Sequence, residues 1–239
     1  MSLKRGRFKP SFKLTIMILC LLPLLIGMGI WQLKRAEFKK QQQNQYRESL
    51  KVNPTLLSTL SIPKNFSRVK LNGKFDTQHI IYIDNKIYHH KIGYYVLIPF
   101  LLTQNNKAVL INIGFITQGK SRQELPSILL NSDTQSLMGI INEYPKKSFF
   151  LGKNSDPSFT SWPMRLQYPN REEIQNKLGY SIEPFMILLD TTGNSMGLIC
   201  DWDFTSMMNP EKHLAYAFQW FAMAGTLILL YIISGYKNI

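Results

Sequence analysis

Two stretches of the chain, one near each end, are apolar without interruption. Residues 14–33 and residues 214–233 each run for 20 positions without a charged side chain. A helix rises about 1.5 Å per residue, so each stretch forms a helix of roughly 30 Å, the hydrocarbon thickness of a bilayer. An amphipathic helix would show a polar face, and a buried strand would be much shorter. The pattern therefore predicts two transmembrane helices with one large domain between them.

A cleaved signal peptide is the alternative for the first stretch, because five basic residues precede it. Its apolar run is longer than the roughly 7–15 residues typical of a signal peptide, and no small-residue cleavage motif follows it. Trp31, Gln32, Lys34 and Arg35 end the run instead, as at a membrane interface. We therefore expect an uncleaved anchor.

The segment between the two stretches has the pattern of a β-rich domain. A helical extension of the first span is expected over residues 34–52, ended by Asn53 and Pro54. Runs rich in β-branched and aromatic residues then predict strands. The predicted strands are Arg68–Phe75, His79–Ile83, Tyr94–Thr103, Lys107–Ile116, Gln135–Tyr144, Phe185–Asp190 and Gly197–Phe204. Turn signals between or within them are Asn72–Gly73, Asp84–Asn85 and Asn105–Asn106.

A helix is expected at residues 170–178, between Asn170 as N-cap and Gly179 just past its end. These elements predict a membrane protein in which two transmembrane α-helices flank a mainly antiparallel β domain of the α+β class, with a barrel as one arrangement of its strands. The expected segments are a basic tail (1–13), the first span (14–33), the β-rich domain (34–212), the second span (214–233) and a short tail (234–239).

The net charge of +13 is concentrated around the first span. Five basic residues precede the span and residues 34–52 add a net +4, so +9 of the +13 flanks it. No nucleic-acid-binding motif accompanies this charge, which favours a lipid bilayer over nucleic acid as the partner. Two short tails around a long loop predict cytoplasmic termini and, in a bacterium, a periplasmic domain at the inner membrane.

The domain contains no motif typical of nucleotide-binding proteins, serine hydrolases, zinc proteases or thiol oxidoreductases. Asp201 and Asp203 are its one candidate acid–base pair, which leaves a membrane-anchored envelope hydrolase open as an alternative. His79, His89 and His90 are interpreted as surface polar residues rather than metal ligands. We therefore expect a protein that is not an enzyme.

The entrance to the second span carries the best candidate site. Asn209 and Pro210 are favourable residues for starting a helix, which places His213 in its first turn at the membrane interface. Three residues share its face: Tyr216, Ala217 and Trp220. Neutral imidazole ligates metals, and flat aromatic rings beside it suit a lipophilic cofactor such as haem. An ordinary aromatic belt at the membrane boundary is the alternative.

Five short patterns follow one another along nearly the whole chain. They are G-x-W-Q-x-x-R, R-x-x-x-x-G-x-F, N-x-G-F, SWPMRLQYPN and H-L-x-Y-A-x-Q-W-F. Their residues outside the fourth pattern are Gly29, Trp31, Gln32, Arg35, Arg68, Gly73, Phe75, Asn112, Gly114, Phe115, His213, Leu214, Tyr216, Ala217, Gln219, Trp220 and Phe221. Together they resemble the surfeit locus protein 1 family, which assists the assembly of cytochrome c oxidase. Phe115 stands where tryptophan is common in that family.

The resemblance implies a bacterial-type assembly factor that handles haem a. In the family, haem a binding is associated with the histidine that opens the second span, which corresponds to His213 as an axial ligand of the iron. Trp220 and Tyr216 would line the site, and we assign Arg35 to a haem propionate from its charge and depth.

The partners that the resemblance implies are the catalytic subunit of cytochrome c oxidase, which would receive the haem, and haem a synthase. Two alternatives without haem stay open: a scaffold that stabilises oxidase subunits, and a structural envelope subunit.

Overall fold

The structure is a computed structural model of the 239-residue chain. It describes residues 8–60, 62–104, 107–119, 121–130, 133–145, 154, 161–190, 198–200, 202 and 209–237. The chain forms two compact units, one of Met1–Asn44 with Phe204–Ile239 and the other of Gln45–Asp203. In the described residues the first unit is helical and the second contains the strands.

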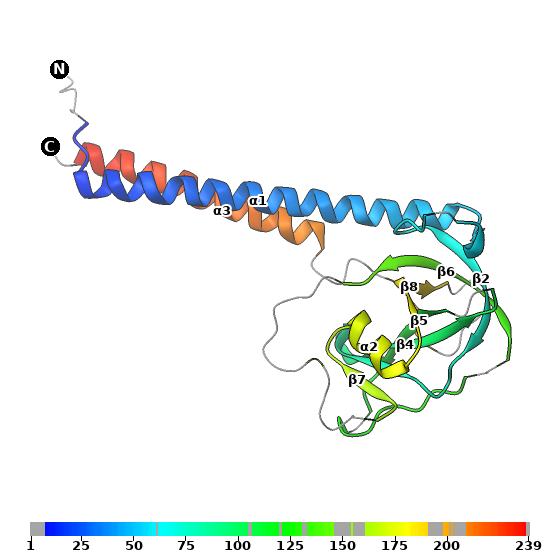
Figure 1. The fold of residues 1–239 in the computed structure, drawn as a ribbon. Helices are drawn as coiled ribbons and strands as arrows, with labels where there is room; N and C mark the ends of the chain where they lie inside the picture. Colours follow the sequence, from blue (N-terminus) through cyan, green and yellow to red (C-terminus); the bar gives the residue numbers. More distant parts are fainter. Residues whose placement is uncertain are drawn as a thin grey trace, which may run out of the picture. The chain divides into compact units, whose positions relative to one another are not determined.

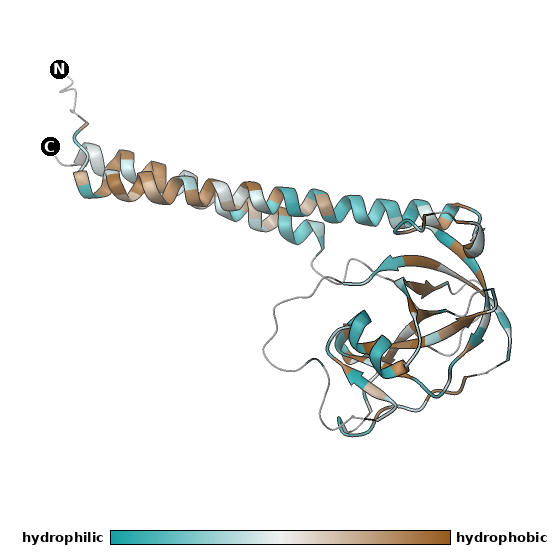
Figure 2. Ribbon diagram, in the orientation of Figure 1, coloured by the Kyte–Doolittle hydropathy of each residue, from teal (hydrophilic) through white to brown (hydrophobic). Residues whose placement is uncertain are grey.

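Two long helices form the described part of the first unit. Helix α1 (Phe12–Lys51) starts in this unit and ends in the second, whereas α3 (Pro210–Lys237) belongs to the first throughout. Both are long and apolar enough to cross a membrane. Hydrophobic residues run along α3 and along the half of α1 nearer its N-terminus, as Figure 2 shows. α1 ends at Lys51, just before Asn53 and Pro54.

The two helices lie side by side and antiparallel (Figure 1). The backbone N–H of Lys9 donates to the carbonyl oxygen of Gly235 at 3.0 Å. The hydroxyls of Thr15 and Tyr231 are 2.9 Å apart, and the Phe8 ring packs edge-on against Tyr231. The start of α1 is therefore paired with the end of α3.

Five strands of the second unit close into a barrel. They are β2 (Arg68–Phe75), β4 (Lys91–Leu102), β5 (Ala108–Thr117), β6 (Gln135–Glu143) and β8 (Ile182–Leu189). The hydrogen-bonded order is β2–β6–β8–β5–β4, and β4 pairs again with β2 to close the ring. Every pairing in the ring is antiparallel except β5–β8, which is parallel. The predicted fold class, two apolar helices flanking a mainly antiparallel barrel-like domain, is confirmed.

Short elements extend and cover this ring. β3 (Ile81–Tyr88) pairs with β4, and β7 (Met164–Leu166) pairs in parallel with β3. β1 (Thr55–Leu56) pairs in parallel with β2 and leads into a 3₁₀ turn at Leu57–Thr59. Helix α2 (Arg171–Leu178) lies beside the strands (Figure 1).

The core of the second unit consists of two hydrophobic clusters on opposite faces of β5. Every residue from Ala108 to Phe115 is buried. Val109 and Ile111 belong to the larger cluster, whereas Leu110 belongs to a cluster that includes Ile174 of α2. Alternate side chains of a strand point to opposite faces, so the continuous apolar run of β5 follows from its being covered on both.

Gly73 marks the point where β2 changes partner. It pairs with Gln135 of β6 and with Leu102 of β4. A Cβ atom at this position would lie 2.1 Å from the carbonyl oxygen of Leu101. Asn72–Gly73 is therefore not a turn but the position in a strand where the seam of the barrel closes, which requires a residue without a side chain.

The N-x-G-F pattern forms a β-bulge in β5. Val96 of β4 pairs with Gly114, but the next residue of β4 pairs with Asn112, so one residue of β5 is extra. Gly114 has φ of 131°, in a region that favours glycine, and its N–H donates to the Asn112 side chain at 3.2 Å. A Cβ atom on Gly114 would lie 2.9 Å from the carbonyl oxygen of Ile199, whose backbone bridges to Phe115. The glycine thus lets the Ile199 segment lie against the barrel.

The predicted strand 68–75 and the predicted helix are confirmed. The Asn170 side chain accepts from the N–H groups of Glu172 and Glu173, and Gly179 follows with φ of 74°. The turn expected at Asp84–Asn85 is wrong, because β3 continues through it by an irregularity at which Asn85 has φ of 57°.

The hairpin between β3 and β4 turns instead at His89 and His90, with φ of 43° and 63°. Both belong to a two-residue loop between the paired Tyr88 and Lys91, so these histidines are surface turn residues, as interpreted. Of the predicted strand Gly197–Phe204, the described residue Ile199 forms a single β-bridge. Asp201 and Asp203 lie outside the described residues. The predicted turn at Asn105–Asn106 lies outside them as well.

Candidate functional site: a buried histidine–glutamine pair

His213 is placed by the capping of α3. The Asn209 carbonyl oxygen accepts from the N–H of Lys212 at 2.9 Å, and its side-chain oxygen accepts from the N–H of Glu211 at 3.3 Å. Pro210, which has no N–H to leave unpaired, is the first residue of the helix. His213 therefore lies in the first turn, with 6% of its surface exposed.

The partner of His213 comes from the other helix of the same unit. Nδ1 of His213 lies 2.7 Å from Oε1 of Gln32 in α1, and Gln32 is 9% exposed. An amide oxygen can only accept a hydrogen bond, so the hydrogen of a neutral imidazole lies on Nδ1. The lone pair of the ring is then on Nε2. No other hydrogen bond to this imidazole occurs within the described part of the chain.

Small residues bring the two helices together around this pair. Ala217, one turn after His213, is 1% exposed, and Ala36 of α1 is also buried. A Cβ atom on Gly29 would lie 2.6 Å from the Phe221 ring, so this glycine makes room for an aromatic residue of α3. The first and last of the five sequence patterns therefore meet in space at two points, Gln32 with His213 and Gly29 with Phe221.

The other predicted site residues have different surroundings. Trp220 is half-buried, whereas Tyr216 is 43% exposed and does not share the buried position of His213. Arg35 is exposed, with its guanidinium carbon 5.9 Å from the centroid of the Trp31 ring. That distance is typical of a cation–π contact. The roles of Trp220, Tyr216 and Arg35 toward a ligand stay predictions.

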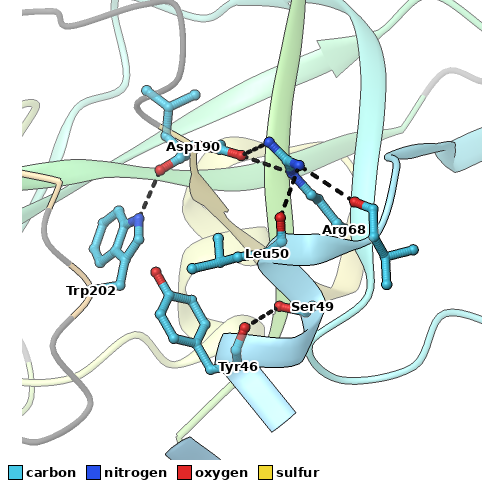
Figure 3. A network of polar contacts seen from close by, with 8 residues as sticks. Tyr46, Ser49, Leu50, Arg68, Asp190 and Trp202 are labelled. Atoms are coloured by element: carbon cyan, nitrogen blue, oxygen red, sulfur yellow. Dashed lines mark hydrogen bonds and ion pairs between the residues drawn. The ribbon is translucent and has the colours of Figure 1, made fainter. Parts of the chain in front are cut away.

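A separate polar network lies in the barrel unit and involves the second sequence pattern. Arg68 donates to Oδ2 of Asp190 from Nε at 2.9 Å and from Nη2 at 2.6 Å. Its Nη1 donates to the carbonyl oxygens of Leu50 at 3.3 Å and Val52 at 3.4 Å (Figure 3). Indole Nε1 of Trp202 donates to the Leu189 carbonyl beside Asp190 at 2.7 Å. Arg68 thus pairs with a buried carboxylate and satisfies carbonyl groups at the end of α1.

A third polar group joins Asp76, His79 and Tyr180. Oδ2 of Asp76 lies 2.6 Å from Nδ1 of His79 and accepts from the Tyr180 hydroxyl at 2.7 Å. Burial, followed by the hydrogen bond to Asp76 and its charge, raises the pKa of Tyr180. Across the described ranges, no group of three or more His, Cys, Asp and Glu side chains is arranged to hold a metal ion. The contacts of Asp76 with His79 and Tyr180 join the β2–β3 connection to the segment after α2.

Sequence reasoning missed the role of Gln32. The signal was present, because Gln32 is the one side-chain amide between residues 14 and 33. A polar side chain in an apolar helix commonly bonds across to a neighbouring helix. The partner could not be identified, since Gln32 and His213 are 181 positions apart.

The fold and the site define a class: a membrane-anchored barrel protein with a buried histidine–glutamine pair between two apolar helices. Residues 19–225 match the model of the SURF1 family. The chain therefore belongs to the SURF1 family, the surfeit locus protein 1 family that its five patterns resemble. This family is associated with the assembly of cytochrome c oxidase, and it is a family of assembly factors rather than of catalysts.

Several similar proteins carry the name of the family. The chain is 24% identical over 223 residues to a SURF1-like protein of Rickettsia bellii, covering 92% of this chain and 88% of that protein. It is 24% identical over 225 residues to a SURF1-like protein of Rickettsia conorii, covering 92% and 90%. A SURF1-like protein of Dictyostelium discoideum is 28% identical over 117 residues, 43% of each chain.

Proposed function

We propose that this protein binds haem a through His213 and assists its insertion into the catalytic subunit of cytochrome c oxidase. One observation carries the proposal: a histidine of the family pattern is buried between two apolar helices with its Nδ1 bound to Gln32. This arrangement leaves the Nε2 lone pair for a metal, and histidine is a common axial ligand of haem iron.

The residues around His213 suit a haem. When bound, haem a would supply the redox-active iron centre that the oxidase requires. Imidazole is the donor, an apolar helix pair matches the macrocycle, and the half-buried Trp220 offers an aromatic surface. Arg35 would pair with a propionate, and Tyr216 would line the site together with Trp220. A single histidine ligand would permit release to the oxidase, whereas a closed ligand set would not.

The proposed setting is the inner membrane of a bacterium, with haem a synthase as supplier and the catalytic oxidase subunit as receiver. Both short tails would be cytoplasmic and the barrel periplasmic. The pairing of Lys9 with Gly235 supports two tails on one side of a bilayer. Alkaline phosphatase fused after residue 120 should be active and one fused after residue 239 inactive, and the reverse pattern would contradict this orientation.

Haem transfer is tested in cells that lack the gene and still make haem a. The wild-type protein should restore oxidase activity and the haem a content of the oxidase. His213→Ala should restore neither, although the protein accumulates in the membrane. Full restoration by His213→Ala, with no haem a on the purified wild-type protein, would instead support the haem-independent scaffold.

A further inference from the structure

We propose that Gln32 is a positioning residue for haem a, which holds the imidazole of His213 in the tautomer and orientation that present Nε2 to the iron. This inference rests on the proposed function and adds a residue to its site. Gln32 would not touch the haem, since its amide oxygen acts on Nδ1, the other nitrogen of the ring.

The hydrogen bond between His213 and Gln32 has the geometry of one that orients a metal-binding histidine. A histidine that ligates a metal almost always donates its other ring N–H to a carboxylate, a carbonyl or water, which fixes both the tautomer and the ring orientation. Oε1 of Gln32 is such an acceptor, 2.7 Å from Nδ1. Both residues are buried, so water competes weakly for either partner.

Gln32 lies in a closely packed part of α1. It lies one turn after Gly29, against which Phe221 packs, and one turn before the buried Ala36. Among the described residues, no carboxylate replaces Gln32 as the partner of Nδ1. A neutral amide adds no charge to an apolar helix pair, whereas a carboxylate there would be costly.

A purely structural role is the competing explanation, because a glutamine and a histidine can hydrogen-bond simply to join two helices. The two roles differ in what they predict for bound haem. A purely structural contact would leave the iron–histidine bond unchanged when Gln32 is replaced. Positioning predicts that the tautomer of His213 and the iron–histidine bond change together.

The first experiment reads the tautomer without haem. The full-length protein with ¹⁵N-labelled histidine is measured by NMR in detergent micelles, and the signal of His213 is identified by its loss in His213→Asn. Protonated Nδ1 is expected in the wild type and in Gln41→Leu, which replaces an exposed glutamine of α1 that bonds Glu37. Gln32→Leu should shift the proton toward Nε2. A wild-type proton on Nε2, or no change in Gln32→Leu, would overturn the inference.

The second experiment measures the bond between the haem iron and His213. Haem a titrated into the apoprotein should bind Gln32→Leu about 10–100-fold more weakly than the wild type. Gln32→Glu should retain haem a, with a higher iron–histidine stretching frequency and a lower reduction potential, because a carboxylate makes the imidazole a stronger donor. Gln41→Leu should match the wild type in all three measurements.

The outcomes separate the two proposals. The role of Gln32 alone would be overturned by the following result. The wild type binds haem a and His213→Asn does not, but both Gln32 variants keep the wild-type affinity, iron–histidine stretching frequency and reduction potential. A wild-type protein that binds no haem a would overturn the proposed function, and with it the role of Gln32 toward haem.

Discussion

Single residues in the barrel unit show how a buried charge is stabilised. The side chain of Asp190 is 5% exposed and that of Arg68 is 15% exposed, and two hydrogen bonds join them. The same arginine satisfies carbonyl groups of Leu50 and Val52. By contrast, the ion pair of Lys51 with Glu48 is on the surface, where such pairs contribute little.

Arg68→Ala should therefore destabilise the protein by about 3 kcal/mol, because it leaves Asp190 buried without its charged partner. Urea unfolding of the full chain in mild detergent, followed by fluorescence, measures the change. Lys51→Ala, the control, should cost less than about 0.5 kcal/mol. Equal effects of the two substitutions would contradict this account of the network.

The thiol of Cys200 gives a prediction about pH. Burial raises the pKa of Cys200 from 9.0 to about 11, and its Sγ donates to the carbonyl oxygen of Ile113 at 3.0 Å. The reactive thiolate appears only as the pH approaches that value. In a Cys20→Ser variant, alkylation of Cys200 at pH 8 should be at least about 100-fold slower than in urea, and should accelerate about tenfold per pH unit up to pH 10. Rapid alkylation of the folded protein at pH 8 would be inconsistent with this burial.

At the scale of elements, glycines decide where helices and strands approach closely. Gly73 closes the barrel seam, Gly114 forms the bulge of β5, and Gly29 admits the ring of Phe221. Three of the five sequence patterns therefore contain a glycine for which the structure provides a steric reason. Other glycines of the chain, such as Gly27 and Gly119, would meet nothing within 4 Å if they carried a Cβ atom.

Gly73→Ala should open the β2–β4 seam, because the added methyl group would overlap the Leu101 carbonyl. A loss of roughly 1–3 kcal/mol is typical of such overpacking. Faster hydrogen exchange of the β2 and β4 amides, measured by mass spectrometry, would report the opening. Gly119→Ala, for which the structure leaves open space, should exchange like the wild type.

The helix pair offers a matched comparison two positions apart. Gly29→Val should separate α1 from α3 at Phe221 and reduce haem a binding severalfold, since Gln32 lies one turn away. Gly27→Val makes the same change where nothing lies within 4 Å, and it should bind haem a normally. The affinity for haem a is measured by titration into Gly29→Val and Gly27→Val. Identical affinities would argue against a contribution of the contact between Gly29 and Phe221.

Local sequence patterns predicted helices and strands, but they did not predict which of these elements contact one another. Strand 68–75 and the helix after Asn170 follow from residue type and capping, which act over a few positions. The barrel closure and the pairing of Gln32 with His213 depend on residues far apart in the chain, and a single sequence carries no direct signal for such pairings. The Asp84–Asn85 turn was wrong because these residues also tolerate an irregularity within a strand, as they do in β3.

At the scale of the whole molecule, the SURF1-family chain combines two apolar helices with a closed barrel. Most of its positive charge flanks the first apolar stretch, and its buried histidine lies in the first turn of α3. Membership of the family associates it with the assembly of cytochrome c oxidase. The binding of haem a through Nε2 of His213 is what we propose for this molecule.

The haem a content of purified full-length protein, co-produced with haem a synthase, is the measurement that decides whether His213 binds haem a. His213→Asn keeps a donor where Nδ1 lies, and hence the bond to Gln32, but removes Nε2. His90→Asn makes the same change at an exposed turn, where asparagine tolerates the positive φ. The amount of haem a per protein should fall at least tenfold in His213→Asn and should be unchanged in His90→Asn. Equal haem a in His213→Asn and the wild type would contradict the proposal.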